Sequence, residues 1–377
     1  MAKLVFGFII IALIGLSNSQ TYAQADPSLN TFGYKLLNYQ ENYLPEKLLS
    51  SRSAVFVSTL PKANGSRGDW KALLNKAHDY LKKIEIDAIA YFHNEDVFSG
   101  AEPRSTFIQW IGNRKVENLI FLSERLVNGQ KEYLIVITPF SAEHELAAHA
   151  QPAWKYQHAD LERLFVVLYR HVNSTKLKRE NLLIVDKPEI FTDIPLKNGK
   201  RFEAYQQDLK LDKLAVPLFN KIVVPEQFPD NNLNQEIARE IEQYNRNVES
   251  ANEQLQQIMS SYPFGYELVD MNNKTPEQLR NAGFQFILYH MVTTGNHIKD
   301  LLDYRIDNTG TAFVSIVAGT EGTSVKPIAA DLPVYKFYIR HIFTNDLFLG
   351  TKWDADTDWQ QALINHIAGL KTELKIR

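Results

Sequence analysis

The alternation of short apolar runs with one long amphipathic segment over residues 54–92 most constrains how this chain can fold. Residues 54–57 and 86–92 are apolar runs of the length typical of buried strands. Between them, Asp69 is placed to cap a helix with one apolar face. That face consists of Trp70, Leu73, Leu74, Ala77, Leu81 and Ile84. A strand, a helix and a second strand in this order favour an α/β layout with parallel strands.

Similar elements continue to about residue 200. Pro103 is suited to open a helix, and residues 119–122 and 133–138 read as strands. Asn128 and Gly129 lie between those strands and predict a type I′ hairpin turn. A further amphipathic helix is expected at about 159–172. The order of elements is similar to that of flavodoxin-like and TIR-like domains, an analogy of fold that carries no function.

Residues 233–260 contain the clearest single helix. Their apolar residues alternate spacings of four and three, which is a heptad seam over three repeats. The seam is formed by Ile237, Ile241, Tyr244, Val248, Ala251, Leu255 and Ile258. Such a seam needs a partner surface, which is either the core of its own domain, a helical hairpin or a second copy of the chain.

We therefore expect an α/β or α+β protein with a mixed sheet sandwiched by helices and two lobes joined by a long amphipathic helix. The expected boundaries are a signal peptide at 1–25, an α/β lobe at 26–200, an irregular linker with the long helix at 201–260, and a sheet-rich α+β lobe at 261–377. In the last lobe, strands are expected at 284–292, 312–317 and 334–343, and a helix from about 357.

Two pairs of short, similar segments raise the question of an internal repeat. Residues 93–100 resemble 343–350, and residues 69–70 resemble 358–359. The two alignments require different registers, so we expect shared local chemistry rather than duplication.

The first 25 residues have the pattern of a secretory signal peptide. Lys3 precedes a 13-residue apolar run, which is too short to span a bilayer of about 30 Å. Residues 23–25 read Ala-Gln-Ala, which predicts cleavage before Asp26. We therefore expect an exported protein, periplasmic or extracellular, with no transmembrane segment after cleavage.

Charge and cysteine content exclude several classes of function. The chain has 41 Lys and Arg against 44 Asp and Glu, a net charge of −3, so no nucleic-acid partner is expected. It has no cysteine, which removes disulfides, thiolate metal sites and cysteine nucleophiles. The sequence predicts no cofactor.

The loop at residues 61–68 is a weak candidate for anion binding. It leads from a strand to a helix N-terminus, where backbone N–H groups favour negative charge. Lys62, Gly65, Arg67 and Gly68 are its candidate residues, but they do not form a P-loop or dinucleotide fingerprint. The alternative is an ordinary solvated loop.

Two patterns suggest metal ligands without matching a full motif. Asp354, Asp356 and Asp358 begin like a calcium loop, but Trp359 and Asn365 stand where an EF-hand needs Gly and Glu. Capping of the helix that follows is the alternative for these acids. Residues 144–149 read His-Glu-Leu-Ala-Ala-His, which resembles the zinc-protease motif His-Glu-x-x-His. The five-residue spacing would place the second histidine about 140° around a helix from the first, so both could not bind one zinc ion from a regular helix.

The remaining candidate site residues are Asp96 and Asp346, which each end a predicted strand and precede an apolar-aromatic segment. In a structural role they would close turns by accepting backbone hydrogen bonds. In a catalytic role they would act as acid and base in a hydrolase. Because no catalytic signature is complete, we favour a non-enzymatic envelope or secreted protein that binds another protein, or itself, through the 233–260 helix. An exported hydrolase using loop carboxylates is the alternative.

Overall fold

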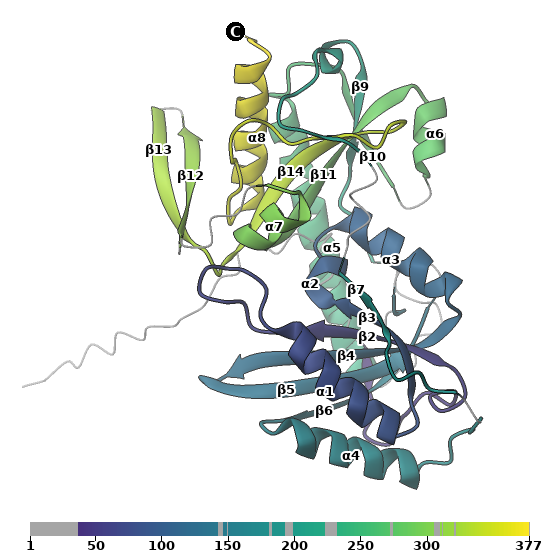
Figure 1. The fold of residues 1–377 in the computed structure, drawn as a ribbon. Helices are drawn as coiled ribbons and strands as arrows, with labels where there is room; N and C mark the ends of the chain where they lie inside the picture. The colour runs from purple at the N-terminus through teal and green to yellow at the C-terminus, as the bar shows by residue number, and fades with distance from the viewer. Residues whose placement is uncertain are drawn as a thin grey trace, which may run out of the picture.

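The computed structural model shows two lobes, each built around one mixed β-sheet covered by helices (Figure 1). This confirms the expected mixed α/β class. The predicted signal peptide lies outside the described residues. The structure describes residues 37–141, 146–148, 150–180, 183–192, 199–222, 232–271, 274–304, 310, 312–319 and 322–376.

The first sheet has the strand order β1-β6-β5-β4-β2-β3-β7. Strand β2 pairs in parallel with β3 and β4, whereas β5 and β6 continue the sheet in antiparallel pairing. The β4–β5 turn has positive φ at Asn128 and Gly129, as the predicted type I′ turn requires. The strands are β1 (Asn38–Tyr39), β2 (Arg52–Ser58), β3 (Asp87–His93), β4 (Val116–Val127), β5 (Gln130–Pro139), β6 (Pro152–His158) and β7 (Glu189–Phe191).

Helices cover both faces of this sheet because the side chains of β2 alternate between two apolar layers. Val55 and Val57 face α1 and α4, while Ala54 and Phe56 face α2 and α3. The Asp69 carboxylate caps α1 by accepting from Ala72 N, as predicted. The helices are α1 (Trp70–Lys83), α2 (Asn94–Val97), α3 (Ala101–Asn113) and α4 (Leu161–Ser174).

The second sheet has the order β10-β9-β11-β14-β15-β8. Strand β9 pairs in parallel with β10 and β11, and β14 and β15 follow in antiparallel pairing. Its strands are β8 (Arg201–Phe202), β9 (Lys213–Pro217), β10 (Tyr266–Val269), β11 (Phe284–Thr294), β14 (Pro333–His341) and β15 (Leu347–Phe348). A separate hairpin, β12 (Ala312–Gly319) and β13 (Gly322–Ala329), stands beside α8 (Figure 1).

The heptad seam of the long helix α5 packs within its own lobe. Its residues from Ile237 to Leu255 are buried in one core with α8 and the second sheet. The segment 201–260, expected as a linker and a joining helix, thus contributes β8, the 3-10 turn η2 (Gln207–Lys210), β9 and α5 to the second lobe. The helices of this lobe are α5 (Asn232–Met259), α6 (Pro276–Asn281), α7 (Gly295–Leu301) and α8 (Trp359–Glu373).

The two lobes repeat one topology. Strands β1, β2, β3, β4, β5 and β6 have the same order and directions as β8, β9, β10, β11, β14 and β15. Helices α1 and α4 cover one face of the first sheet as α5 and α8 cover one face of the second, and α3 and α6 lie on the opposite faces.

The two short sequence similarities do not mark this repeat of topology, and they reflect shared local chemistry, as expected. Residues 93–100 follow β3, whereas 343–350 span the β14–β15 turn, so this similarity joins segments that are not equivalent. The similarity of 69–70 to 358–359 pairs the caps of α1 and α8, which are not equivalent either. Both similarities come from local turn and cap chemistry.

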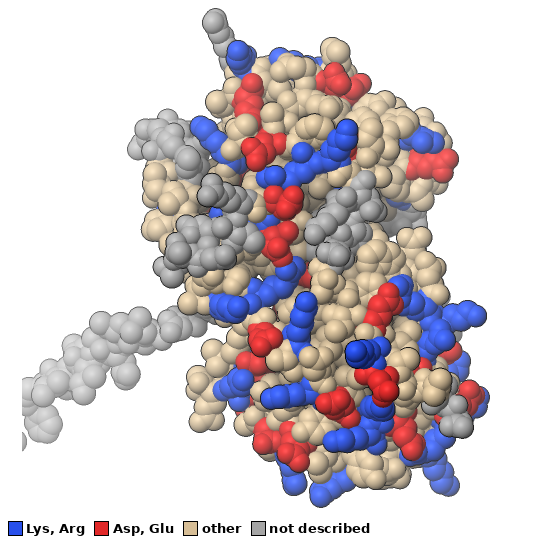
Figure 2. All heavy atoms as spheres, viewed as in Figure 1, with Lys and Arg blue, Asp and Glu red and all other residues tan. Residues whose placement is uncertain are grey.

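Two further observations concern the surface. Within the described residues, no helix combines the length and the apolar character needed to cross a membrane. Acidic and basic side chains are interspersed over the face drawn in Figure 2.

Candidate metal centre between the lobes

The best-defined polar cluster lies where the carboxyl ends of parallel strands from both lobes meet. His93 is the last residue of β3, and Asp96 follows in the short helix α2. His297 lies in α7, directly after β11. Open α/β sheets bind their ligands at the carboxyl ends of strands, next to the point where the strand order reverses. In the first sheet that point lies at β2, between β3 and β4.

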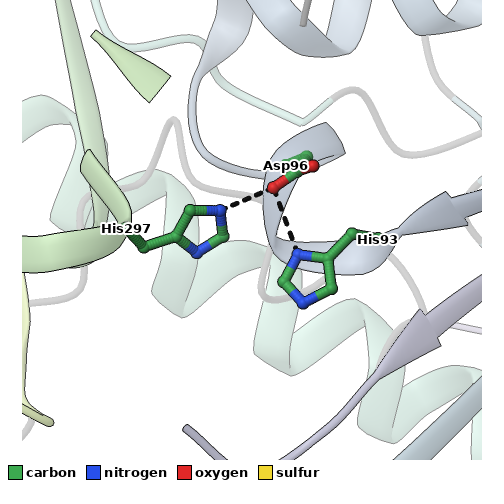
Figure 3. Close-up of side chains that lie close together, drawn as sticks. All are labelled: His93, Asp96 and His297. Carbon is green, nitrogen blue, oxygen red and sulfur yellow. Dashed lines mark hydrogen bonds and ion pairs between the residues drawn. The ribbon is translucent and has the colours of Figure 1, made fainter. Parts of the chain in front are cut away.

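Asp96 joins the two histidines through one oxygen. Its Oδ1 lies 2.5 Å from His297 Nε2 and 3.1 Å from His93 Nδ1 (Figure 3). One ligand atom from each of the three residues lies within 4.8 Å of the others. The exposed fractions are 2% for His93, 3% for Asp96 and 4% for His297. The three side chains thus form a buried set of two imidazoles and one carboxylate.

The far nitrogen of each histidine faces an oxygen atom. His93 Nε2 lies 3.2 Å from Glu95 Oε2, and the Ser58 hydroxyl donates to the other oxygen of Glu95. His297 Nδ1 lies 3.1 Å from Thr293 Oγ1. The Thr293 contact is of the kind that fixes the orientation and the tautomer of a metal-binding histidine, whereas His93 Nε2 and Glu95 Oε2 make no hydrogen bond with each other. The near nitrogens of both histidines donate to Asp96 Oδ1, so a metal ion at this place would have to take the positions of those two protons.

Burial and hydrogen bonding act in opposite directions on the ionisation of this cluster. Burial alone would raise the pKa of Asp96, but hydrogen bonds from His297 and His93 hold it well below its usual range. Burial lowers the pKa of His297 more than Asp96 raises it. The cluster therefore holds an ionised carboxylate beside a neutral His297 imidazole at neutral pH.

The loop at residues 61–68, suggested for anion binding, instead packs against the second lobe. Gly65 lies with φ +73° so close to Ala330 O that a Cβ would stand 1.9 Å from it, and its own carbonyl accepts from the Thr294 hydroxyl. Asn64 O accepts from Asn296 Nδ2 at 2.6 Å. These contacts bring the loop against the start of α7.

The other candidate residues of this loop, Arg67, Lys62 and Gly68, each contact protein groups. Arg67 binds the carboxylates of Asp96 and Asp300. The backbone N–H of Lys62 donates to Ser66 O within the loop, and Gly68 lies against Leu60 O. A phosphate would have to displace two carboxylates from Arg67.

Asp96 and Asp346 have different partners. The described hydrogen bonds to the Asp96 carboxylate come from side chains, where the sequence suggested backbone donors. Asp346 lies at the β14–β15 turn and accepts from Lys200 N at 2.8 Å. The structure thus places one aspartate in the cluster between the lobes and the other in a turn of the second lobe.

The three aspartates of the suggested calcium loop also bind separate partners. Asp354 lies 2.7 Å from the buried Lys336 Nζ and 3.1 Å from His366 Nδ1. Asp356 pairs with Lys326 at 2.8 Å, and Asp358 caps α8 by accepting from Gln361 N. The capping alternative is confirmed for Asp358.

Sequence reasoning found Asp96 but missed both histidines. The spacing of three between His93 and Asp96 is a pattern that suits one side of a helical turn, and it was a usable signal. His297 is 201 residues from Asp96, so only the tertiary fold reveals its role. Of the other histidine motif, residues 144, 145 and 149 lie outside the described residues.

No protein-family model matches the chain, and no curated protein is significantly similar to it in sequence.

Proposed function

We propose that this protein is an exported, non-enzymatic binding protein that holds a divalent transition-metal ion between its two lobes. His93, Asp96 and His297 are the ligands in this proposal. The observation that carries it is the convergence of two imidazole nitrogens and a carboxylate oxygen within 4.8 Å of one another across the lobe boundary.

The donor set selects the class of ion. Imidazole nitrogen suits zinc and its first-row neighbours, whereas calcium and magnesium prefer sites made of oxygen alone. Two histidines and one carboxylate are a common set of protein ligands for such metals. The outer contact of His297, to Thr293, matches the support that metal-binding imidazoles usually have.

The charge of the region also favours a cation with two positive charges. Glu95, Asp96 and Asp300 place three carboxylates around one guanidinium, that of Arg67. Among these four groups, the carboxylates outnumber the guanidinium by two. Asp96 is the buried carboxylate of the three, and a divalent ion would lower the negative charge around it.

Burial favours binding over catalysis. All three ligands are at least nine-tenths buried, and an ion needs far less room than an organic substrate. The hydrolase alternative needs two carboxylates that face one substrate, whereas Asp96 and Asp346 have different partners.

Export is part of this proposal because residues 1–25 have the pattern of a signal peptide. A protein partner, if the chain has one, would contact a surface other than the buried α5 seam.

Calorimetric titration of the purified protein with Zn²⁺ tests this function. We expect one ion per chain, with His297→Gln weakening binding at least about 100-fold, because a lost ligand costs more than a lost outer contact. His158→Gln, a change at a partly exposed histidine of β6, is the control and should bind as the parent does. Absence of Zn²⁺ binding by the parent, or equal binding by His297→Gln, would refute the site; circular dichroism checks that each variant is folded.

A further inference from the structure

Arg67 occupies the Asp96 oxygen that the metal would take. Its Nε and Nη2 donate to Asp96 Oδ1 at 3.2 and 2.8 Å, the same atom that both histidines contact. Its Nη1 binds Asp300 Oδ2 on α7, so one guanidinium spans carboxylates from the two lobes. The Arg67 side chain is 21% exposed and that of Asp300 is 47% exposed.

One carboxylate oxygen cannot serve all of these partners together with a metal ion. It has two lone-pair directions, and four N–H or imidazole nitrogens already point at it. A divalent ion on this oxygen would also be repelled by a guanidinium at hydrogen-bond distance. Arg67 therefore competes with the metal unless it moves to another carboxylate.

Asp300 is the carboxylate placed to receive it. It already holds one end of the guanidinium, it lies on the same helix as His297, and its exposure leaves it free to adjust. Moving the remaining N–H groups of Arg67 toward Asp300 would keep the guanidinium paired while Asp96 turns to the ion.

We propose that Arg67 sets the metal affinity of this site, as the internal counter-ion of Asp96 that Asp300 takes over when the metal binds. This inference rests on the proposed function. It assigns to the 61–68 loop the control of a cation, whereas the sequence suggested capture of an anion.

The test is competitive Zn²⁺ titration, against a chromophoric chelator, of the parent protein and two variants. Arg67→Met removes the competing charge, and we expect it to bind Zn²⁺ at least about tenfold more tightly. Asp300→Asn deprives Arg67 of its second acceptor, and we expect it to bind several-fold more weakly. Opposite shifts identify competition, because a purely structural Arg67–Asp300 bridge would make both variants change in the same direction.

Two further variants complete the design. Arg67→Lys keeps the charge and should stay within a few-fold of the parent. Arg67→Gln also removes the charge, and it can replace Arg67→Met if that variant does not fold. Arg114→Met breaks a bidentate Arg–Glu pair of the first lobe, with Glu189, and should leave the affinity unchanged. If the parent binds Zn²⁺ but Arg67→Met binds no more tightly, or Arg67→Lys tightens as much as Arg67→Met, the inference is wrong and the metal site stands. If the parent binds no Zn²⁺, the proposed function fails.

Discussion

The two lobes share six strands and three helices in the same arrangement, and they differ in the segments that carry the cluster. In the first lobe, the extra helix α2 follows β3 and brings Asp96. In the second lobe, the chain between β11 and β14 carries α7, β12 and β13, where the first lobe has only the turn at Asn128 and Gly129. The candidate metal centre thus lies where the two copies of the topology diverge.

This difference separates what builds the scaffold from what builds the site. The shared elements bury aliphatic and aromatic side chains on both faces of each sheet, and many sequences meet that requirement. The divergent segments lie at the carboxyl ends of strands, where added residues leave the sheet intact. Function in this protein is therefore expected from the insertions.

The largest expected effect is the loss of the carboxylate that joins the lobes. Asp96→Ala leaves His93, His297 and Arg67 without their shared acceptor in a buried place. Breaking such a buried pair costs about 3–5 kcal/mol of unfolding free energy. Urea denaturation measures it.

The matched change in the second lobe is Asp346→Ala. It removes one hydrogen bond to Lys200 N in a turn and should cost about 1 kcal/mol. Equal losses for the two aspartates would contradict a special role for Asp96.

Because α1 and α5 are equivalent helices, a Leu→Ala change in either one should reduce the unfolding free energy by a similar amount. Leu74 in α1 is fully buried and Leu255 in α5 is 2% exposed. Each change to Ala should cost about 2–5 kcal/mol. Leu211→Ala, at an 89% exposed position, should change stability by less than about 0.5 kcal/mol. A Leu255→Ala protein that changes mass in light scattering without losing stability would show that the α5 seam serves assembly instead.

The second lobe should carry a pH dependence of its own. Burial lowers the pKa of His366, whose Nδ1 lies between Asp354 and Tyr205. In the unfolded chain this histidine takes up a proton near its ordinary pKa of about 6.5, whereas the folded protein resists it. Stability is therefore full above that pH and falls as the pH decreases below it, by at most about 1.4 kcal/mol per pH unit.

His366→Gln should make this slope shallower between about pH 6.5 and 5.5. The measurement is the unfolding free energy from denaturant titrations at several pH values, with His158→Gln as the control. An unchanged slope in His366→Gln would mean that His366 takes up its proton equally in the folded and unfolded states.

Small effects on stability are expected at the helix caps. Asp69 caps α1 and Asp358 caps α8, each accepting one backbone hydrogen bond. Changing either one to Ala should cost about 0.5–2 kcal/mol, and changing it to Asn should cost less, because Asn also caps. Thermal melts of the four variants decide this, and equal losses for Ala and Asn would show that the capping bond is not what stabilises the helix.

Features that depend on local spacing could be predicted from the sequence. The start of α1 at the Asp69 cap, the hairpin at Asn128 and Gly129, and the buried seam of α5 follow from intervals of a few residues. Each of these signals acts within one or two turns of the chain, so its physics is contained in the segment itself.

Features that depend on tertiary placement could not be predicted. Strand β9 has only five residues, and nothing in their pattern identifies the strands with which it pairs. The second sheet was therefore expected to begin after residue 260, not at these residues. Lys336 lies fully buried in β14 because Asp354 and two backbone carbonyls receive its ammonium. His297 reaches Asp96 only through the packing of the lobes.

Diffraction from crystals grown with Zn²⁺, with data collected at the zinc absorption edge, tests the central claim most directly. The claim predicts one anomalous peak between the lobes, about 2.0–2.2 Å from His93 Nδ1, an Asp96 carboxylate oxygen and His297 Nε2. A peak bound to other residues, or no peak between the lobes in a well-ordered crystal, would contradict it.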